Sequence, residues 1–163
     1  METQKEQQGD KESIESDSYS SALEKGESAA LAKVRERFDF NENSIDRLPF
    51  HNSRHTEGVI RRTDTVLAAI QEVRPDLVND KSRKKGRLRG AFHDTVQNYE
   101  EVTITEGNQA KIIRKRFTVK NEKDSGEELV EYMKKANQEA GQELFAAEEM
   151  EDAQRSIDVT VPG

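Results

Sequence analysis

Apolar side chains are scarce in this chain and unevenly spread along it, and this distribution limits the fold that the chain can adopt. Hydrophobic residues account for 32% of the 163 residues, and charged residues account for 36%. Within residues 1–27 the apolar side chains are few, namely Met1, Ile14, Tyr19, Ala22 and Leu23. Because so little apolar surface cannot offset the entropy lost on ordering, we predict a disordered tail over 1–27. The remaining stretch, 28–163, is long enough to bury a core and is predicted to form one domain.

Apolar residues in that domain recur mostly at the 3.6-residue spacing of amphipathic helices. This spacing predicts five helices, over residues 28–38, 52–73, 87–99, 124–138 and 142–159. Asn52 or Ser53 is suited to cap the second helix, and Asp124 or Ser125 is suited to cap the fourth. The expected fold class is therefore all-α.

The segments between these helices are polar. Residues 41–49 are expected to form a loop, and the basic stretch 77–86 is expected to connect the second and third helices. Residues 100–123 are either a long loop or a short hairpin around the turn-like Glu106-Gly107-Asn108. A connection of this length is unusual inside a compact domain and is often functional. The all-α fold is thus expected to carry one irregular insertion.

All three histidines of the chain lie in two short motifs. His51 and His55 are four residues apart at the start of the second predicted helix, where such a pair shares one face. His93 and Asp94 are adjacent in the third predicted helix. Either motif alone can arise by chance, and a lone buried histidine is more often a hydrogen-bonded core residue. The two motifs together predict a metal site.

The composition narrows the chemistry of that site. The chain contains no cysteine, so any metal must be held by imidazole and oxygen atoms. Imidazole and carboxylate ligands with open positions suit one or two divalent ions such as Mn, Fe, Zn, Co or Mg. Such an ion can polarise a phosphoryl oxygen and activate a water molecule. A site of this kind would supply a nucleophile without cysteine or serine.

The residues of the two motifs carry a family resemblance. The run Phe50-His51-Asn52-Ser53-Arg54-His55-Thr56, followed by Phe92-His93-Asp94-Thr95, resembles the HD superfamily of metal-dependent phosphohydrolases. The first run is especially similar to the signature of its cyclic-nucleotide phosphodiesterase branch. The resemblance covers residues 50–98 well and residues 120–163 loosely. It implies an HD-like bundle of about five helices that hydrolyses a nucleotide or another phosphate ester.

The resemblance also implies roles for individual residues. It makes His55, His93 and Asp94 metal ligands, with Asp94 placed to bridge two ions if two bind. His51 matches the position that donates a proton to the leaving oxygen, a task that suits an imidazole. Asn52 would orient a ligand or cap the helix.

Other residues are candidates for the remaining parts of such a site. The family completes its metal shell with a later Asp, for which Asp158 is the best candidate here and Asp152 the second. Arg54 and Arg62, on the same helix as His55, are candidates to bind substrate phosphate, since guanidinium groups match phosphate oxygens. Two further basic stretches, 81–89 and 111–116, are either solvated surface or phosphate clamps.

The chain also departs from the family pattern. In related proteins the completing Asp lies further downstream than this chain reaches, and the chain ends on Val161-Pro162-Gly163. The stretch Thr95-Val96-Gln97-Asn98-Tyr99 stands where the phosphodiesterase branch has further histidines. These departures predict a truncated or divergent member, a single metal or a different phosphate ester. The alternative is a catalytically inactive HD-like helical module with a binding or regulatory role.

Charge and hydropathy limit the partners of the chain. The net charge of −7 argues against nucleic acid but leaves a small phosphorylated substrate open. No apolar run approaches the ~20 residues needed to span a membrane. The N-terminus lacks the apolar segment of a secretory signal, so a cytoplasmic location is expected.

Overall fold

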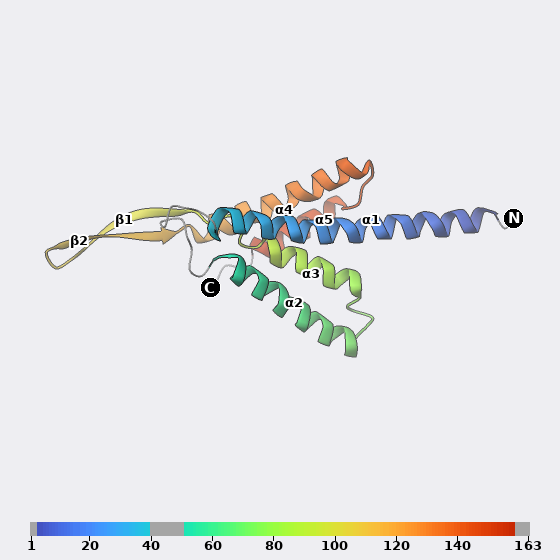
Figure 1. The fold of residues 1–163 in the computed structure, drawn as a ribbon, viewed down its shortest axis with the longest axis horizontal. Coiled ribbons are helices and arrows are strands. Elements are labelled where there is room, and N and C mark those ends of the chain that lie inside the picture. The colour runs from blue at the N-terminus through green and yellow to red at the C-terminus, as the bar shows by residue number, and fades with distance from the viewer. Residues whose placement is uncertain (1–2, 40–50, 159–163) are drawn as a thin grey trace.

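The computed structural model describes residues 3–39 and 51–158, and most of these residues are helical (Figure 1). The elements follow the order α1 (Thr3–Val34), η1 (Arg35–Asp39), α2 (Ser53–Val73), α3 (Asp80–Phe92), β1 (Tyr99–Glu106), β2 (Gln109–Arg116), α4 (Thr118–Ala140) and α5 (Ala147–Asp158). The sequence predicted an all-α fold, and the structure confirms a mainly α chain that also contains two β-strands. No helix in the described ranges has the length and apolar character required to cross a membrane.

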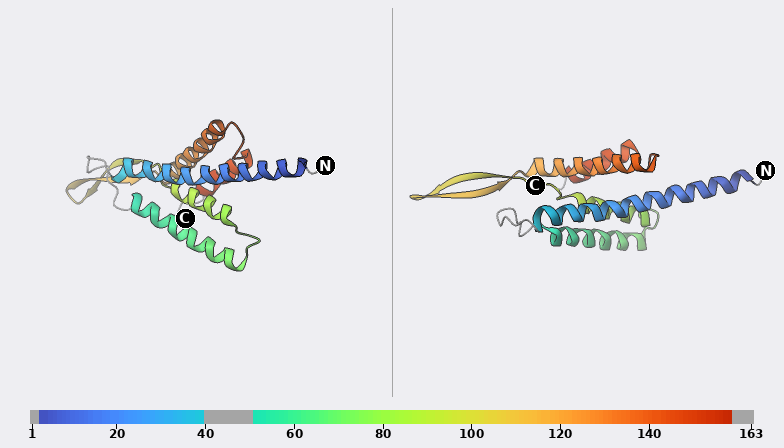
Figure 2. Two further views of the ribbon diagram at one scale, coloured as in Figure 1. Left: turned by 45° about the vertical axis from the view of Figure 1, so that its right-hand side comes forward. Right: turned by 45° about the horizontal axis from the view of Figure 1, so that its top comes forward.

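Helix α1 is the longest element and runs along the whole bundle. In the right-hand view of Figure 2, α4 and α5 lie above α1, and α2 lies below it. The main core brings together residues of α1, α2, α3, α4 and α5, with Leu23, Leu88, Phe92, Leu129, Phe145 and Ile157 among its most deeply buried side chains. The core thus draws on elements from both ends of the chain.

Residues 3–27, predicted to lie in a disordered tail, belong to helix α1, and those from Tyr19 onward are part of the core. Helix α1 begins at Thr3, and from Tyr19 onward it packs into the core, where Leu23 is only 1% exposed. Gly26 lies so close to α3 and α4 that a Cβ atom there would come within 2.5 Å of Leu88 and of Tyr132. The average composition of 1–27 concealed that Tyr19, Ala22 and Leu23 share one helix face. The core accordingly includes residues on both sides of the predicted boundary at residue 28.

The structure corrects the start of the third helix. Asn79 caps α3, and a reciprocal capping box joins Asn79 and Ser82. Helix α3 consequently begins at Asp80, inside the stretch predicted to be a connector, and ends at Phe92. Such a box satisfies backbone N–H groups that a helix otherwise leaves unpaired. This stabilisation outweighs the repulsion between the basic side chains of the same stretch. The pair His93–Asp94 therefore follows the helix instead of lying within it.

The irregular insertion is a β-hairpin, the second of the two predicted alternatives. Strands β1 and β2 pair antiparallel, with Glu106 opposite Gln109 at the tip and Tyr99 opposite Arg116 at the base. Gly107 adopts φ 63° in the turn, a left-handed conformation that glycine adopts without strain. The hairpin projects from one end of the helical bundle (Figure 1).

The last two helices were predicted with displaced starts. Helix α4 begins at Thr118 instead of residue 124, and α5 begins at Ala147 instead of residue 142. Gly141, with φ 65°, closes the C-terminus of α4. The predicted loop at 41–49 and the predicted last helical residue, Val159, lie outside the described residues.

Candidate metal centre

The start of α2 holds two of the three histidines. Asn52 is extended and its side-chain oxygen accepts a hydrogen bond from the backbone N–H of His55 at 3.1 Å, so the predicted cap is confirmed. Asp39 of η1 accepts hydrogen bonds from the backbone N–H of Ser53, at 3.0 Å, and from its hydroxyl group. Because these bonds anchor the first turn, His51 lies just before the helix and His55 just inside it.

The end of α3 supplies the third histidine and the carboxylate. His93 is the C-cap residue of α3 and has a right-handed helical backbone conformation, and Asp94 follows it. The backbone oxygen of Thr95 accepts a hydrogen bond from Arg37 of η1 at 2.7 Å. The same short element, η1, therefore contacts both segments that carry the histidine motifs.

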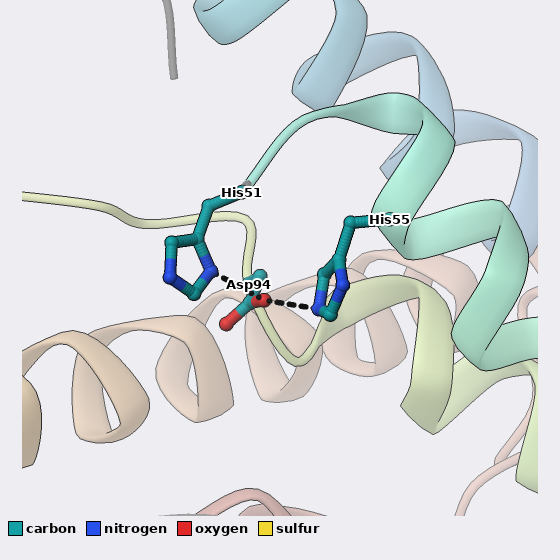
Figure 3. Close-up of side chains that lie close together, drawn as sticks. All are labelled: His51, His55 and Asp94. Carbon is teal, nitrogen blue, oxygen red and sulfur yellow. Dashed lines mark hydrogen bonds and ion pairs between the residues drawn. The ribbon is translucent and has the colours of Figure 1, made fainter. Parts of the chain in front are cut away.

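The three imidazole rings converge on one oxygen atom of Asp94. His51 Nδ1 lies 3.2 Å from Asp94 Oδ2, and His55 Nε2 lies 3.2 Å from the same atom (Figure 3). His93 Nε2 is closer, at 2.9 Å. His51, His55 and Asp94 each offer one ligand atom, and these atoms all lie within 4.8 Å of one another. The Asp94 side chain is only 7% exposed.

These separations are compatible with a shared ion as well as with direct hydrogen bonds. Two ligand atoms that lie about 2.1 Å from an octahedral ion, at a right angle, are about 3.0 Å apart. The three nitrogen–oxygen distances around Asp94 Oδ2 are close to that value. Imidazole nitrogen and carboxylate oxygen are the donors expected for a transition-metal ion.

The protonation of the cluster is strongly perturbed. Burial alone would raise the pKa of Asp94, but hydrogen bonds from His51 and His93 hold that pKa well below its usual range. Burial lowers the pKa of His55, and the charges of His93 and His51 lower it further. Three imidazolium ions around one oxygen would repel each other, whereas a metal ion needs these rings neutral.

A backbone contact sets the orientation of His93. Burial would lower the pKa of His93, but its bonds to Asp94 and to Gly90 outweigh burial and raise it. Nδ1 lies 2.5 Å from the backbone oxygen of Gly90, which can only accept a hydrogen bond. Nδ1 therefore carries the proton, and Nε2 is directed at Asp94. Such a contact behind a ligating histidine is the usual way in which a protein orients the ring.

Two side chains lie at the other oxygen of Asp94, and a third, that of Glu122, binds one of them. Gln97 Nε2 donates to Asp94 Oδ1 at 3.0 Å, and Arg116 Nη2 lies 3.5 Å from the same atom. Arg116 in turn donates to Glu122 at 2.7 Å. Arg116 belongs to a basic stretch of six residues, and only the register of the hairpin distinguishes it from its neighbours. No sequence signal marks Gln97 or Glu122.

The predicted ligand Asp158 does not join the cluster. Asp158 is exposed at the end of α5, and no carboxylate of α5 belongs to the ligand group found among residues 3–39 and 51–158. Asp152, the second candidate, is also exposed and pairs with Arg155 at 3.6 Å. The completing Asp is therefore not found on the described part of this helix.

The two predicted phosphate-binding arginines are both exposed on α2. Arg62 lies near enough to His55 for its charge to lower the pKa of that ring. Its guanidinium group also lies over Gly58, where an added Cβ would come within 3.1 Å of it. Arg62 thus borders the histidine cluster, while Arg54 lies one residue before His55 in the first turn of α2.

Comparison with known proteins identifies no related protein. No protein-family model matches the chain, and neither a curated protein nor a solved structure matches it. The resemblance to the HD superfamily accordingly rests on the two histidine motifs and stays a prediction.

Proposed function

We propose that this chain is a metal-dependent phosphohydrolase of the HD kind, in which His51, His55 and Asp94 hold a divalent ion. The observation that carries the proposal is the convergence of three imidazole nitrogens on Asp94 Oδ2, each within 3.2 Å. These groups come from two segments of the chain. A histidine with a purely structural role needs only one hydrogen-bonding partner and not a cluster of three imidazoles around one carboxylate oxygen. His93, pointing at the same oxygen, completes or supports the ligand set.

The charge of the site suits an anionic substrate. The proposed ligands carry one negative charge, on Asp94, because the imidazoles bind metal in their neutral form. A divalent ion in such a shell supplies a Lewis acid for a phosphoryl oxygen and lowers the pKa of a coordinated water. Arg62 is exposed and close enough to His55 for its charge to lower the pKa of that ring, which supports a role in binding the oxygens of a phosphate ester; Arg54, also exposed, is the second candidate.

His51 has two candidate roles that exclude each other at one atom. The resemblance makes it the proton donor, whereas the proximity of its ring to His55 and Asp94 makes it a potential metal ligand, with Nδ1 the nitrogen that faces Asp94 Oδ2. An imidazole that binds a metal through Nδ1 has lost the proton that a general acid would deliver from that atom. The distance of 3.2 Å between His51 Nδ1 and Asp94 Oδ2 suits a hydrogen bond as well as a shared ion, so the choice between the two roles is left to experiment.

Hydrolysis with and without metal tests the proposed activity. Protein freed of metal with a chelator is assayed on bis(p-nitrophenyl) phosphate and on p-nitrophenyl phosphate, before and after addition of Mn²⁺. We expect Mn²⁺-dependent hydrolysis of at least one ester by the wild type and none by Asp94→Asn. Hydrolysis that is absent in both proteins, or equal in both, contradicts the enzymatic proposal.

A second candidate is a helical module that binds metal without catalysis. The observation in its favour is the exposed position of Asp158, because the described residues then supply one carboxylate to the cluster. In that case Mn²⁺ raises the melting temperature of the wild type but not that of Asp94→Asn, and neither protein hydrolyses the esters.

A further inference from the structure

The guanidinium group of Arg116 lies among three side-chain oxygens next to the proposed metal site. Its Nε donates to Gln97 Oε1 at 2.7 Å, and its Nη2 donates to Glu122 Oε1 at 2.7 Å. The same Nη2 lies 3.5 Å from Asp94 Oδ1. One cation therefore contacts oxygen atoms from the loop after α3, from the start of α4 and from the proposed metal ligand.

The oxygens around Arg116 are buried as well as close. Glu122 is 3% exposed, and the side chain of Arg116 is 18% exposed. The second oxygen of Glu122, Oε2, is buried and has no hydrogen-bonding partner among the described residues. Two carboxylates and an amide oxygen in such surroundings need a positive charge beside them, because unpaired buried charge is strongly unfavourable.

The hydrogen bonds also determine how Asp94 can bind a metal. Because Gln97 Oε1 accepts from Arg116, its Nε2 must be the atom that donates to Asp94 Oδ1. Oδ1 is thus engaged by an amide and faces a fixed cation, while Oδ2 faces the three imidazoles. Asp94 is held so that only one of its oxygens is directed at the ion.

We infer that Arg116 is a built-in cation that takes the place of a second metal ion, so that this centre binds one divalent ion through Asp94 Oδ2. The inference rests on the proposed function, since it concerns the same site. Carboxylate and amide oxygens are donors that Mn²⁺ and Mg²⁺ accept. Removal of the guanidinium group leaves Asp94 Oδ1, Gln97 Oε1 and both oxygens of Glu122 around a space that suits a second hard cation. Arg116 acts on the site through Asp94 and is in this sense a positioning residue.

Counting bound Mn²⁺ in matched variants tests the inference. Full-length wild type, Arg116→Ala and the control Lys115→Ala are titrated with Mn²⁺ by calorimetry and examined by electron paramagnetic resonance. Lys115 is the exposed neighbour of Arg116 on β2, so the control removes the same charge away from Asp94. We expect one isolated Mn²⁺ in the wild type and in Lys115→Ala, and two spin-coupled Mn²⁺ ions in Arg116→Ala.

Two additional variants separate charge from structural damage. Glu122→Gln combined with Arg116→Ala removes the extra carboxylate and is expected to return the count to one. Arg116→Lys keeps a cation in place and is expected to stay at one. Mn²⁺ should also raise the melting temperature of Arg116→Ala by more than it raises that of the wild type, because only this variant gains an ion beside Glu122.

The possible outcomes distinguish this inference from the proposed function. A wild type that binds no Mn²⁺ overturns both. A wild type that binds two ions overturns the inference alone and leaves the proposed function standing. An Arg116→Ala variant that folds, binds one ion and gains no more thermal stability from Mn²⁺ than the wild type also overturns the inference. If that variant does not fold, Arg116→Gln replaces it, with the same expected count of two.

Discussion

The two sides of Asp94 are built from different regions of the molecule and have opposite chemistry. Oδ2 faces three imidazoles, which come from the start of α2 and the end of α3. Oδ1 faces the amide of Gln97 and the guanidinium of Arg116, at the base of the hairpin. Imidazoles can exchange protons for a metal ion, whereas a guanidinium keeps its charge at any ordinary pH. The carboxylate of Asp94 therefore has an adjustable side, formed by His51, His55 and His93, and a fixed side, formed by Gln97 and Arg116.

The largest expected effect follows from removing the charge that both sides share. Asp94→Asn keeps the size of the side chain but loses the anionic ligand, so the affinity for Mn²⁺ should fall on the order of 100-fold or more, beyond the loss typical of residues behind a ligand. Calorimetric titration measures it. The matched control is Asp158→Asn, which removes an exposed carboxylate and should leave the affinity unchanged. Equal losses of Mn²⁺ affinity in the two variants would show that Asp94 is not a metal ligand.

The adjustable side is tested by truncating its histidines one at a time. His55→Ala and His51→Ala should each weaken Mn²⁺ binding by roughly 10- to 100-fold if both rings are ligands. If His51 is the proton donor instead, His51→Ala keeps the affinity and lowers kcat by roughly 100-fold or more. Titration and steady-state kinetics on the same preparations separate these roles, and an unchanged affinity in His55→Ala would contradict the proposed ligand set.

The fixed side is expected to matter less. Gln97→Leu removes the amide that orients Asp94 Oδ1 and leaves the remaining ligands in place, so Mn²⁺ affinity should fall by about 10-fold, as for other residues behind a ligand. Lys115→Ala serves as the comparison, because its side chain is exposed on the same hairpin. A loss as large as that of Asp94→Asn would mean that the two sides are not separable.

The smallest effect is expected at an ion pair away from the site. Asp64 of α2 bonds to Arg83 of α3 at 3.0 Å, and this bond lowers the pKa of Asp64. A carboxyl group whose folded pKa is depressed stabilises the fold above its ordinary value of ~3.9 and loses that contribution as the pH falls through the folded pKa. Asp64→Asn should therefore lower the melting temperature slightly at pH 7, because partly exposed pairs contribute little, and the difference from the wild type should shrink as the pH falls below ~3.9. Its Mn²⁺ affinity should equal that of the wild type.

The parts of the fold that were predicted correctly depend on local chemistry. Helix α2 runs from Ser53 to Val73, and Asn52 is its N-cap. The capping residue predicted the start of this helix, and the apolar spacing predicted its extent. The first part of helix α1, before residue 28, was missed because its few apolar residues are buried only once α3 and α4 cover them. The start of α3 was missed because a capping box between Asn79 and Ser82 counted for more than the polar character of the stretch.

The candidate site divides in the same way. His51, His55, His93 and Asp94 were found together because short motifs hold them at fixed positions around two helix ends. Asp158 lies outside the ligand group of the described residues, since its position along α5 says nothing about the direction of its side chain. Arg116 was predicted only as one member of a basic stretch, and no role was predicted for Gln97 or Glu122, because the three meet only through the pairing of β1 with β2 and the start of α4.

The sequence by itself determined the helical class, the lack of thiol ligands and the imidazole–carboxylate donors, because composition and short-range spacing specify these directly. The tertiary structure alone decided which oxygen of Asp94 faces the histidines and which faces Arg116. That choice depends on the register of the hairpin, with Tyr99 opposite Arg116, and on the packing of η1 against both motifs. Contacts between segments far apart in the chain leave no local pattern, since each residue type suits many surroundings until the fold supplies one.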